Sequence, residues 1–103
     1  GHGNRAARNA ARAQMKYRGS ETFWKHFYDL SPSQKESARK AWQIFKADPF
    51  DPRLRPHKIH RLSTALGRTV HAVEIEADLR VIFYLDGDIV RTVDIGSHDL
   101  YER

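Results

Sequence analysis

The residues best suited to chemistry gather near the end of the chain. An alternating apolar stretch, residues 89–95, ends in glycine, and His98 and Tyr101 follow just beyond it. A histidine at this point can transfer protons at the rim of a rigid sheet, within about one turn of an aromatic ring. The preceding apolar stretch carries Arg80, whose guanidinium keeps its charge and matches phosphate oxygens. With a basic stretch upstream, these residues suggest a small RNA-handling protein.

Length and composition indicate one small intracellular domain. The 103 residues match the common size of a single domain. The absence of cysteine excludes disulfides and thiolate metal sites, and fits a reducing cytosol. The longest apolar run, Val81 to Leu85, is too short to span a membrane, and no apolar segment of a signal peptide precedes it. We therefore expect a soluble, cytoplasmic protein without a membrane partner.

The net charge of +5 is unevenly distributed. Three of the charges lie in a segment without acidic residues: Arg5, Arg8 and Arg12. Without that segment, residues 1–14, the chain has 15 basic and 13 acidic residues. The only methionine is Met15, so we expect residues 1–14 to be an extension or an appended segment and residues 15–103 to form the domain. A basic arm that binds nucleic acid is the alternative interpretation of this extension.

A second basic stretch extends from residue 53 to residue 68 and contains neither Asp nor Glu. Its basic and histidine side chains are Arg53, Arg55, His57, Lys58, His60, Arg61 and Arg68. A surface patch of one charge sign attracts phosphate backbones, which makes these residues candidate nucleic-acid contacts. An equally weighted alternative is a solvated surface of loops and sheet edge, where such side chains discourage pairing with other strands.

Two helices are expected in the first half of the chain, after a short strand over residues 15–18. Ser20 can cap the first helix. The apolar face of this helix has helical spacing: Phe23, Trp24, Phe27 and Leu30. Ser31 and Gln34 form a capping-box signature for the second helix, and the proline after Asp48 ends it. The short connection predicts an antiparallel helical hairpin whose aromatic side chains belong to the core.

The second half of the chain changes to an apolar period of two. This period predicts strands over residues 57–62, 69–76, 79–85 and 89–95. Leu66-Gly67 is expected in a turn, and Asp86-Gly87 is a strong hairpin signal. The sequence therefore predicts an α+β fold. Its N-terminal helical hairpin would pack on one face of a small, twisted, mainly antiparallel sheet.

Strand parity assigns the charged side chains to one face of that sheet. The purely apolar parity should face the helices, so Glu74 and Arg80 should both point to the opposite, open face. A three-residue hairpin loop over residues 86–88 would pair Arg80 with Asp94, whereas a two-residue loop would pair it with Val93. The simpler interpretation is that Glu74, Arg80 and Asp94 form an ordinary cross-strand ion network on a solvated sheet face.

Six short motifs follow one another in a characteristic order. They are Phe23-Trp24, Leu30-Ser31-Pro32, Asp48-Pro49-Phe50, Asp78-Leu79-Arg80-Val81-Ile82-Phe83-Tyr84, Asp86-Gly87-Asp88 and Ile95-Gly96-Ser97-His98-Asp99. In this order they resemble the RelE/ParE superfamily, the toxins of type II toxin–antitoxin systems. The resemblance covers about residues 15–103. It implies a helical hairpin packed on a twisted, mainly antiparallel sheet.

The RelE branch of this family implies an endoribonuclease that cuts mRNA at the ribosome, inhibits translation and needs no metal or other cofactor. The 2′-hydroxyl of the substrate would attack its own 3′-phosphate and yield a 2′,3′-cyclic phosphate. The implied partners are a cognate antitoxin protein, mRNA and the ribosome. The ParE branch implies inhibition of DNA gyrase instead, and a catalytically inert antitoxin-binding module is a third interpretation.

The resemblance also implies roles for single residues. Arg80 matches the arginine that stabilises the phosphate, and His98 matches a polar residue that can act as general acid. Glu74 falls where some subfamilies have a carboxylate and others a histidine, which makes it the candidate general base. Tyr101 lies near a C-terminal aromatic residue that stacks on a base. Two further polar positions, used in a histidine-rich subfamily, correspond to Asp78 and His57.

Overall fold

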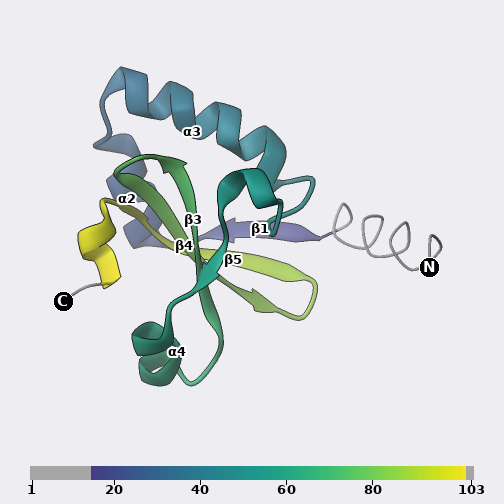
Figure 1. The fold of residues 1–103 in the computed structure, drawn as a ribbon. Helices are drawn as coiled ribbons and strands as arrows, with labels where there is room; N and C mark the ends of the chain where they lie inside the picture. The colour runs from purple at the N-terminus through teal and green to yellow at the C-terminus, as the bar shows by residue number, and fades with distance from the viewer. Residues whose placement is uncertain (1–14, 102–103) are drawn as a thin grey trace.

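The computed structural model describes residues 15–101, without the side chains of His98 and Tyr101. The predicted extension, residues 1–14, lies outside the described residues. The elements in chain order are β1 (Lys16–Gly19), α2 (Glu21–Tyr28), α3 (Pro32–Phe45), the 3₁₀ turn η1 (Pro52–Leu54), β2 (His57–Lys58), α4 (His60–Leu66), β3 (Val70–Glu76), β4 (Leu79–Asp86), β5 (Ile89–Gly96) and the 3₁₀ turn η2 (His98–Tyr101). Figure 1 shows α3 above the sheet and α4 below it.

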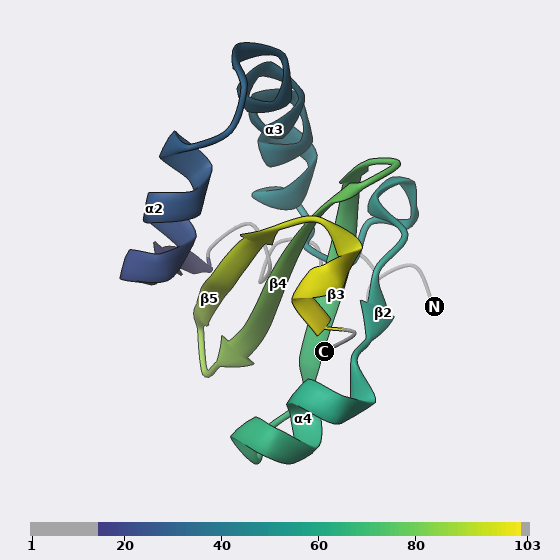
Figure 2. The same ribbon diagram turned by 90° about the vertical axis from the view of Figure 1, so that its left-hand side faces the viewer.

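The strands form one five-stranded sheet in the order β1-β5-β4-β3-β2. The first strand pairs with β5 in parallel, and the other neighbours pair antiparallel. Figure 2 shows the four antiparallel strands side by side. The predicted α+β class with a mainly antiparallel sheet is confirmed. None of the helices within residues 15–101 is long and apolar enough to cross a lipid bilayer.

Both predicted helix caps are present. The Ser20 hydroxyl oxygen accepts a hydrogen bond from the Phe23 backbone N–H at 3.0 Å and begins α2. At the start of α3, the Ser31 hydroxyl accepts from the Gln34 N–H, and the Gln34 side chain accepts from the Ser31 N–H. Such caps satisfy backbone donors that the first helical turn leaves without partners.

The main core lies between the sheet and the helices α2 and α3. Its buried members are Ala38, Phe45, Leu54, Val73, Leu79, Val81, Phe83, Val90 and Ile95. Phe45 of α3 packs edge-to-face on Phe83 of β4, with ring centroids 5.1 Å apart. Each large apolar side chain buried in this way contributes about 1.5–3 kcal/mol. The prediction that the apolar parity of β4 faces the helices is confirmed.

The opposite face of the sheet is less open than predicted. Its apolar residues Ile59, Val70, Ala72 and Ile82 are buried as well. The segment expected to be a strand over residues 57–62 pairs only at His57–Lys58 and then forms α4. The prediction of a strand is confirmed at His57–Lys58 and wrong from His60 onward, where the hydroxyl of Ser63 accepts from the Val70 N–H at 2.9 Å and ties a helical turn to β3. Gly67 ends this helix in the left-handed conformation.

The pairing of β4 with β5 differs from both predicted registers. The tight turn is Gly87-Asp88, with Gly87 at a positive φ, so Asp86 pairs with Ile89. An irregularity between Ile82 and Phe83 then leaves one extra residue in β5. Arg80 consequently lies opposite Gly96, and neither Val93 nor Asp94 is its partner.

Candidate anion-binding site

Three strands bring the candidate residues to one end of the sheet. Glu74 of β3 and Arg80 of β4 are direct cross-strand partners, and Gly96 of β5 lies on the other side of Arg80. The turn η2, His98–Tyr101, begins two residues after Gly96. The backbone therefore brings the start of η2 to the end of the sheet that carries the Glu74–Arg80 pair.

The guanidinium of Arg80 is held in a fixed orientation. One terminal nitrogen donates to Glu74 Oε1 at 3.0 Å, and the other donates to the backbone oxygen of Ala77 at 3.0 Å. Only 14% of the side chain is exposed. Its Nε is buried and has no hydrogen-bond partner among the residues that the structure describes. A guanidinium held this way keeps its charge in a fixed position, which suits it to bind an anion.

The predicted solvated ion network is wrong in two respects. The Arg80 side chain is largely buried, and Asp94 does not take part. In place of Asp94, Arg55 approaches the Glu74–Arg80 pair, with its Nη1 3.8 Å from Glu74 Oε2. Glu74 thus lies between two guanidinium groups, and this cluster of three side chains carries one net positive charge.

Two other predicted nucleic-acid contacts, Arg53 and His57, interact with residues close to them in the sequence. Arg53 forms a two-point contact with Asp51, at 3.0 Å from Nε and 2.9 Å from Nη2. These bonds lower the pKa of Asp51 below its ordinary value. His57 Nδ1 contacts the backbone oxygen of Arg55 at 3.1 Å. The fork of Arg53 therefore faces its own carboxylate partner rather than Glu74.

The basic stretch divides between the two ends of the sheet. Lys58 is exposed beside His71, and Arg61 is exposed on α4. Arg68 lies over the ring of Tyr84, 4.5 Å from its centroid, at the opposite end of β4 from Arg80. One continuous patch, as the sequence predicted, is therefore not formed by the described side chains.

Three predicted residues belong to the turns at this end of the sheet. Asp78 lies in the turn between β3 and β4 and is exposed. His98 and Tyr101 bound η2, and their side chains lie outside the described part of the structure. Gly96 allows η2 to fold back, because a Cβ atom at this position would lie 3.1 Å from Leu100 Cδ2.

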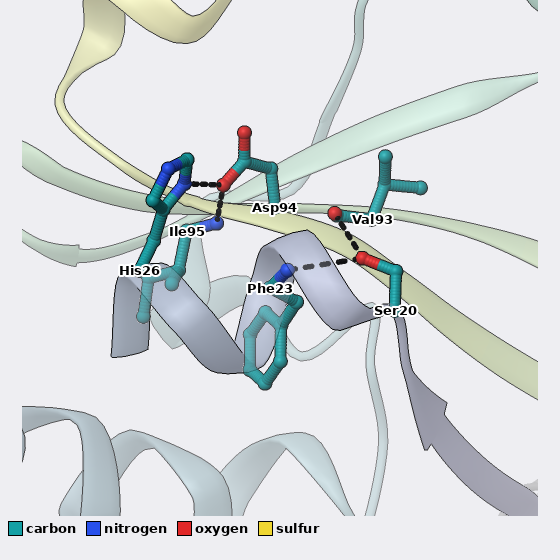
Figure 3. A network of polar contacts seen from close by, with 6 residues as sticks. All are labelled: Ser20, Phe23, His26, Val93, Asp94 and Ile95. Atoms are coloured by element: carbon teal, nitrogen blue, oxygen red, sulfur yellow. Dashed lines mark hydrogen bonds and ion pairs between the residues drawn. The ribbon is translucent and has the colours of Figure 1, made fainter. Parts of the chain in front are cut away.

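A second polar junction was missed by the sequence analysis (Figure 3). His26 Nδ1 of α2 lies 2.6 Å from Asp94 Oδ1, which also accepts from the Ile95 backbone N–H at 2.8 Å. Ser20 donates to the backbone oxygen of Val93 at 2.6 Å. The pairing of β1 with β5 stops before these residues, so α2 holds the end of β5 in place of a strand. Sequence spacing gives no signal for a contact between residues 68 positions apart.

An apolar cavity of about 300 Å³ lies between β1, α2, α3 and the sheet. Aromatic side chains form much of its wall, and two of them, Trp24 and Trp42, are 45% and 39% exposed. Arg18 and Arg39 are the charged side chains that line it. The absence of a side chain at Gly19 allows the rings of Phe23 and Trp24 to pack against its backbone, since a Cβ there would lie 2.7 Å from each ring. This groove can accept an apolar segment of another molecule.

No group of three or more His, Asp or Glu side chains among the described residues is arranged to hold a metal ion. Among the charged side chains at this end of the sheet are the Arg55–Glu74–Arg80 cluster and the exposed Asp78.

Similarity to known proteins is found at the level of the fold and not of the sequence. No protein-family model and no curated protein sequence matches the chain. Solved structures do match, and they show that the chain has the RelE/ParE-like toxin fold.

Three of these neighbours are YafQ from E. coli, the RelE–RelB complex from the archaeon Pyrococcus horikoshii, and a YoeB/ParE toxin from Agrobacterium tumefaciens. YafQ aligns with a TM-score of 0.65 at 14% identity, over 87% of this chain and 100% of its own. The RelE complex gives 0.63 at 11%, over 81% and 93%. The YoeB/ParE toxin gives 0.61 at 15%, over 82% and 99%.

Proposed function

We propose that the protein is the toxin of a type II toxin–antitoxin system and that it cleaves mRNA at the ribosome. The observation that carries this proposal is the Arg80 site. A largely buried guanidinium, fixed by Glu74 and the Ala77 carbonyl, lies at the sheet end from which η2 begins, on a fold shared with toxins. A fixed cation of this kind suits the negative charge that develops on a phosphate during RNA cleavage.

The proposed reaction is an internal transfer of the phosphoryl group. Glu74 Oε2 accepts the proton of the 2′-hydroxyl, whose oxygen then forms a bond to the adjacent phosphorus. Arg80 stabilises the additional charge on the phosphate oxygens. His98 donates a proton to the 5′-oxygen as the bond from phosphorus to that oxygen breaks. The products are a 2′,3′-cyclic phosphate and a free 5′-hydroxyl, and Tyr101 stacks on a neighbouring base.

The apolar cavity supports the second half of the proposal, a protein antitoxin. The RelE neighbour was solved together with RelB. Partly exposed aromatic side chains beside a concave apolar surface are typical of a protein interface. We propose that an amphipathic segment of the antitoxin fills this cavity and that its acidic residues meet Arg18 and Arg39 at the rim.

Induced expression in bacteria tests the ribonuclease. Wild type should arrest growth and leave new mRNA 5′ ends, whereas Arg80→Ala and His98→Ala should do neither. Lys40→Ala, an exposed site on α3, is the matched control and should behave like wild type. Growth arrest that survives alanine at both positions would contradict the catalytic assignment. Arrest with DNA-damage signals and intact mRNA would instead favour a gyrase inhibitor.

A further inference from the structure

Two arginines contact Glu74 in different ways. Arg80 is 14% exposed and lies 3.0 Å from Glu74 Oε1, with a second bond to the Ala77 carbonyl. The Arg55 side chain is 79% exposed, and its Nη1 lies 3.8 Å from Glu74 Oε2. Arg80 is therefore a fixed donor, whereas the contact of Arg55 is loose and easily exchanged for another anion.

The backbone of Arg55 is nevertheless held firmly. This residue has the left-handed conformation, with φ 49° and ψ 54°, which costs free energy for any residue with a Cβ. Three features hold the backbone of Arg55 in this conformation. The neighbouring Leu54 side chain is buried, the Arg55 N–H donates to the Pro52 backbone oxygen, and His57 Nδ1 contacts the Arg55 backbone oxygen. The rigid backbone thus carries an exposed side chain that reaches Glu74, and strained residues of this kind cluster at functional sites.

We propose that Arg55 is a mobile phosphate-binding arm that rests on Glu74 in the free protein and transfers to an RNA phosphate when substrate binds. This inference rests on the proposed function, because it requires RNA as the ligand. The transfer exchanges a carboxylate for a phosphate as the partner of one guanidinium, and Glu74 keeps its bond to Arg80. Glu74 Oε2 is then released, which is the oxygen proposed to accept the 2′-hydroxyl proton. Substrate binding and preparation of the base are thus linked.

Glu74 consequently competes with RNA for Arg55, and removal of its charge should strengthen binding. The test measures binding of a fluorescent eight-nucleotide RNA, 2′-O-methylated at every position, by anisotropy at low salt. Such RNA has no 2′-hydroxyl, so binding is measured without cleavage. Glu74→Gln should tighten binding by about three- to tenfold, and Arg55→Gln should weaken it by about tenfold. Arg55→Gln should also reduce the salt slope of binding by about 0.7, the share of one phosphate contact.

The double variant, Glu74→Gln with Arg55→Gln, shows whether Glu74 opposes RNA binding through Arg55 or only through its negative charge. If Arg55 mediates the competition, Glu74→Gln should have no effect in the Arg55→Gln background. Arg53→Gln is the matched control, since it removes the same charge from the same loop but from a guanidinium already engaged by Asp51. It should weaken binding about twofold or less.

Several results would overturn the proposal. They are an unchanged affinity in Glu74→Gln, equal tightening in the Arg55→Gln background, equal losses at Arg53 and Arg55, and the absence of binding by wild type. Thermal unfolding of each variant shows whether it is folded, and Glu74→Asp provides a second test if Glu74→Gln unfolds. Its shorter carboxylate should also release Arg55 and tighten binding. A protein that binds as expected but leaves mRNA uncut would contradict the ribonuclease and not the arm.

Discussion

The two faces of the sheet differ in the chemistry of the side chains they carry. On the face covered by α2 and α3, apolar side chains surround a cavity whose wall includes two partly exposed tryptophans. On the other face, apolar residues are buried as well, and the end of the sheet holds a charged cluster of two arginines and one glutamate. An apolar concave surface suits a protein segment, whereas fixed guanidinium groups suit phosphate.

One strand contributes side chains to both faces, because successive side chains along a strand point to opposite sides of the sheet. Leu79, Val81 and Phe83 of β4 point into the helix-side core. Arg80, which lies between the first two in the sequence, points to the opposite face and belongs to the charged cluster. Substitutions on one face should therefore change one readout and spare the other.

The largest effect is expected on the charged face. Arg80→Ala should lower RNA cleavage by about 10²- to 10³-fold, because it removes a preorganised donor to the charge that develops on the phosphate. Antitoxin affinity should change by no more than about twofold. Cleavage assays and titration calorimetry with the antitoxin measure the two quantities. Equal losses in both would show that the faces are not independent.

The next effect is expected on the helix face. Trp24→Ala should weaken antitoxin binding by about 30-fold, since a large aromatic side chain at the centre of an interface contributes about 2 kcal/mol. Trp24 packs on Phe23 and Phe27, so a lower melting temperature is also expected. Cleavage by the antitoxin-free protein should persist at a temperature below the transition. Lys40→Ala, on the exposed side of α3, serves as the control.

A smaller effect is expected where the charged face meets the chain end. Gly96→Ala places a Cβ 3.1 Å from Leu100 Cδ2 and should push η2 away from β5. Cleavage should fall by about tenfold, because a shift of His98 misaligns the proposed acid. Stability should fall by about 1 kcal/mol, the lower end for an overpacked site. Normal cleavage in a destabilised protein would mean that η2 does not position the acid.

Much of the fold could be predicted because its signals are local. Serine caps, the change of apolar period and the turn glycine each depend on neighbours within a few residues, and they placed α2, α3 and the meander. Strand parity, which is also local, predicted Glu74 and Arg80 on one face of the sheet, but their direct pairing depends on a register shift between Glu74 and Glu76.

Other features depend on contacts distant in the sequence. The apolar pattern predicts a strand where α4 forms, although Ile59, Leu62 and Leu66 also have helical spacing. The contact of Ser63 with Val70, which ties this helix to β3, lies outside that local pattern. The irregularity in β5 and the His26–Asp94 junction likewise form only when the elements assemble. The approach of Arg55 to Glu74 depends on the left-handed backbone conformation of Arg55, which no sequence motif predicts.

The smallest effect concerns a titratable group on the helix face. His71 packs between Phe50 and Phe83, at 4.9 and 5.5 Å between ring centroids, with Lys58 as its cross-strand partner. Burial, and secondly the charge of Lys58, lower the pKa of His71 below its ordinary value of 6.5. The unfolded chain therefore binds a proton at a higher pH than the folded protein does. The free energy of unfolding should fall as the pH drops below about 6.5, and the loss should level off below the folded pKa.

His71→Phe should remove this part of the pH dependence and keep the aromatic packing. Denaturant unfolding of both proteins at a series of pH values between about 4 and 8 measures the difference of slopes. The effect should appear below the ordinary histidine pKa and vanish above it, because His71 is neutral in both states there. Parallel pH profiles for wild type and variant would show that His71 is as easily protonated in the folded protein as in the unfolded chain. In that case the helix face would contain no histidine kept neutral by its surroundings at this position.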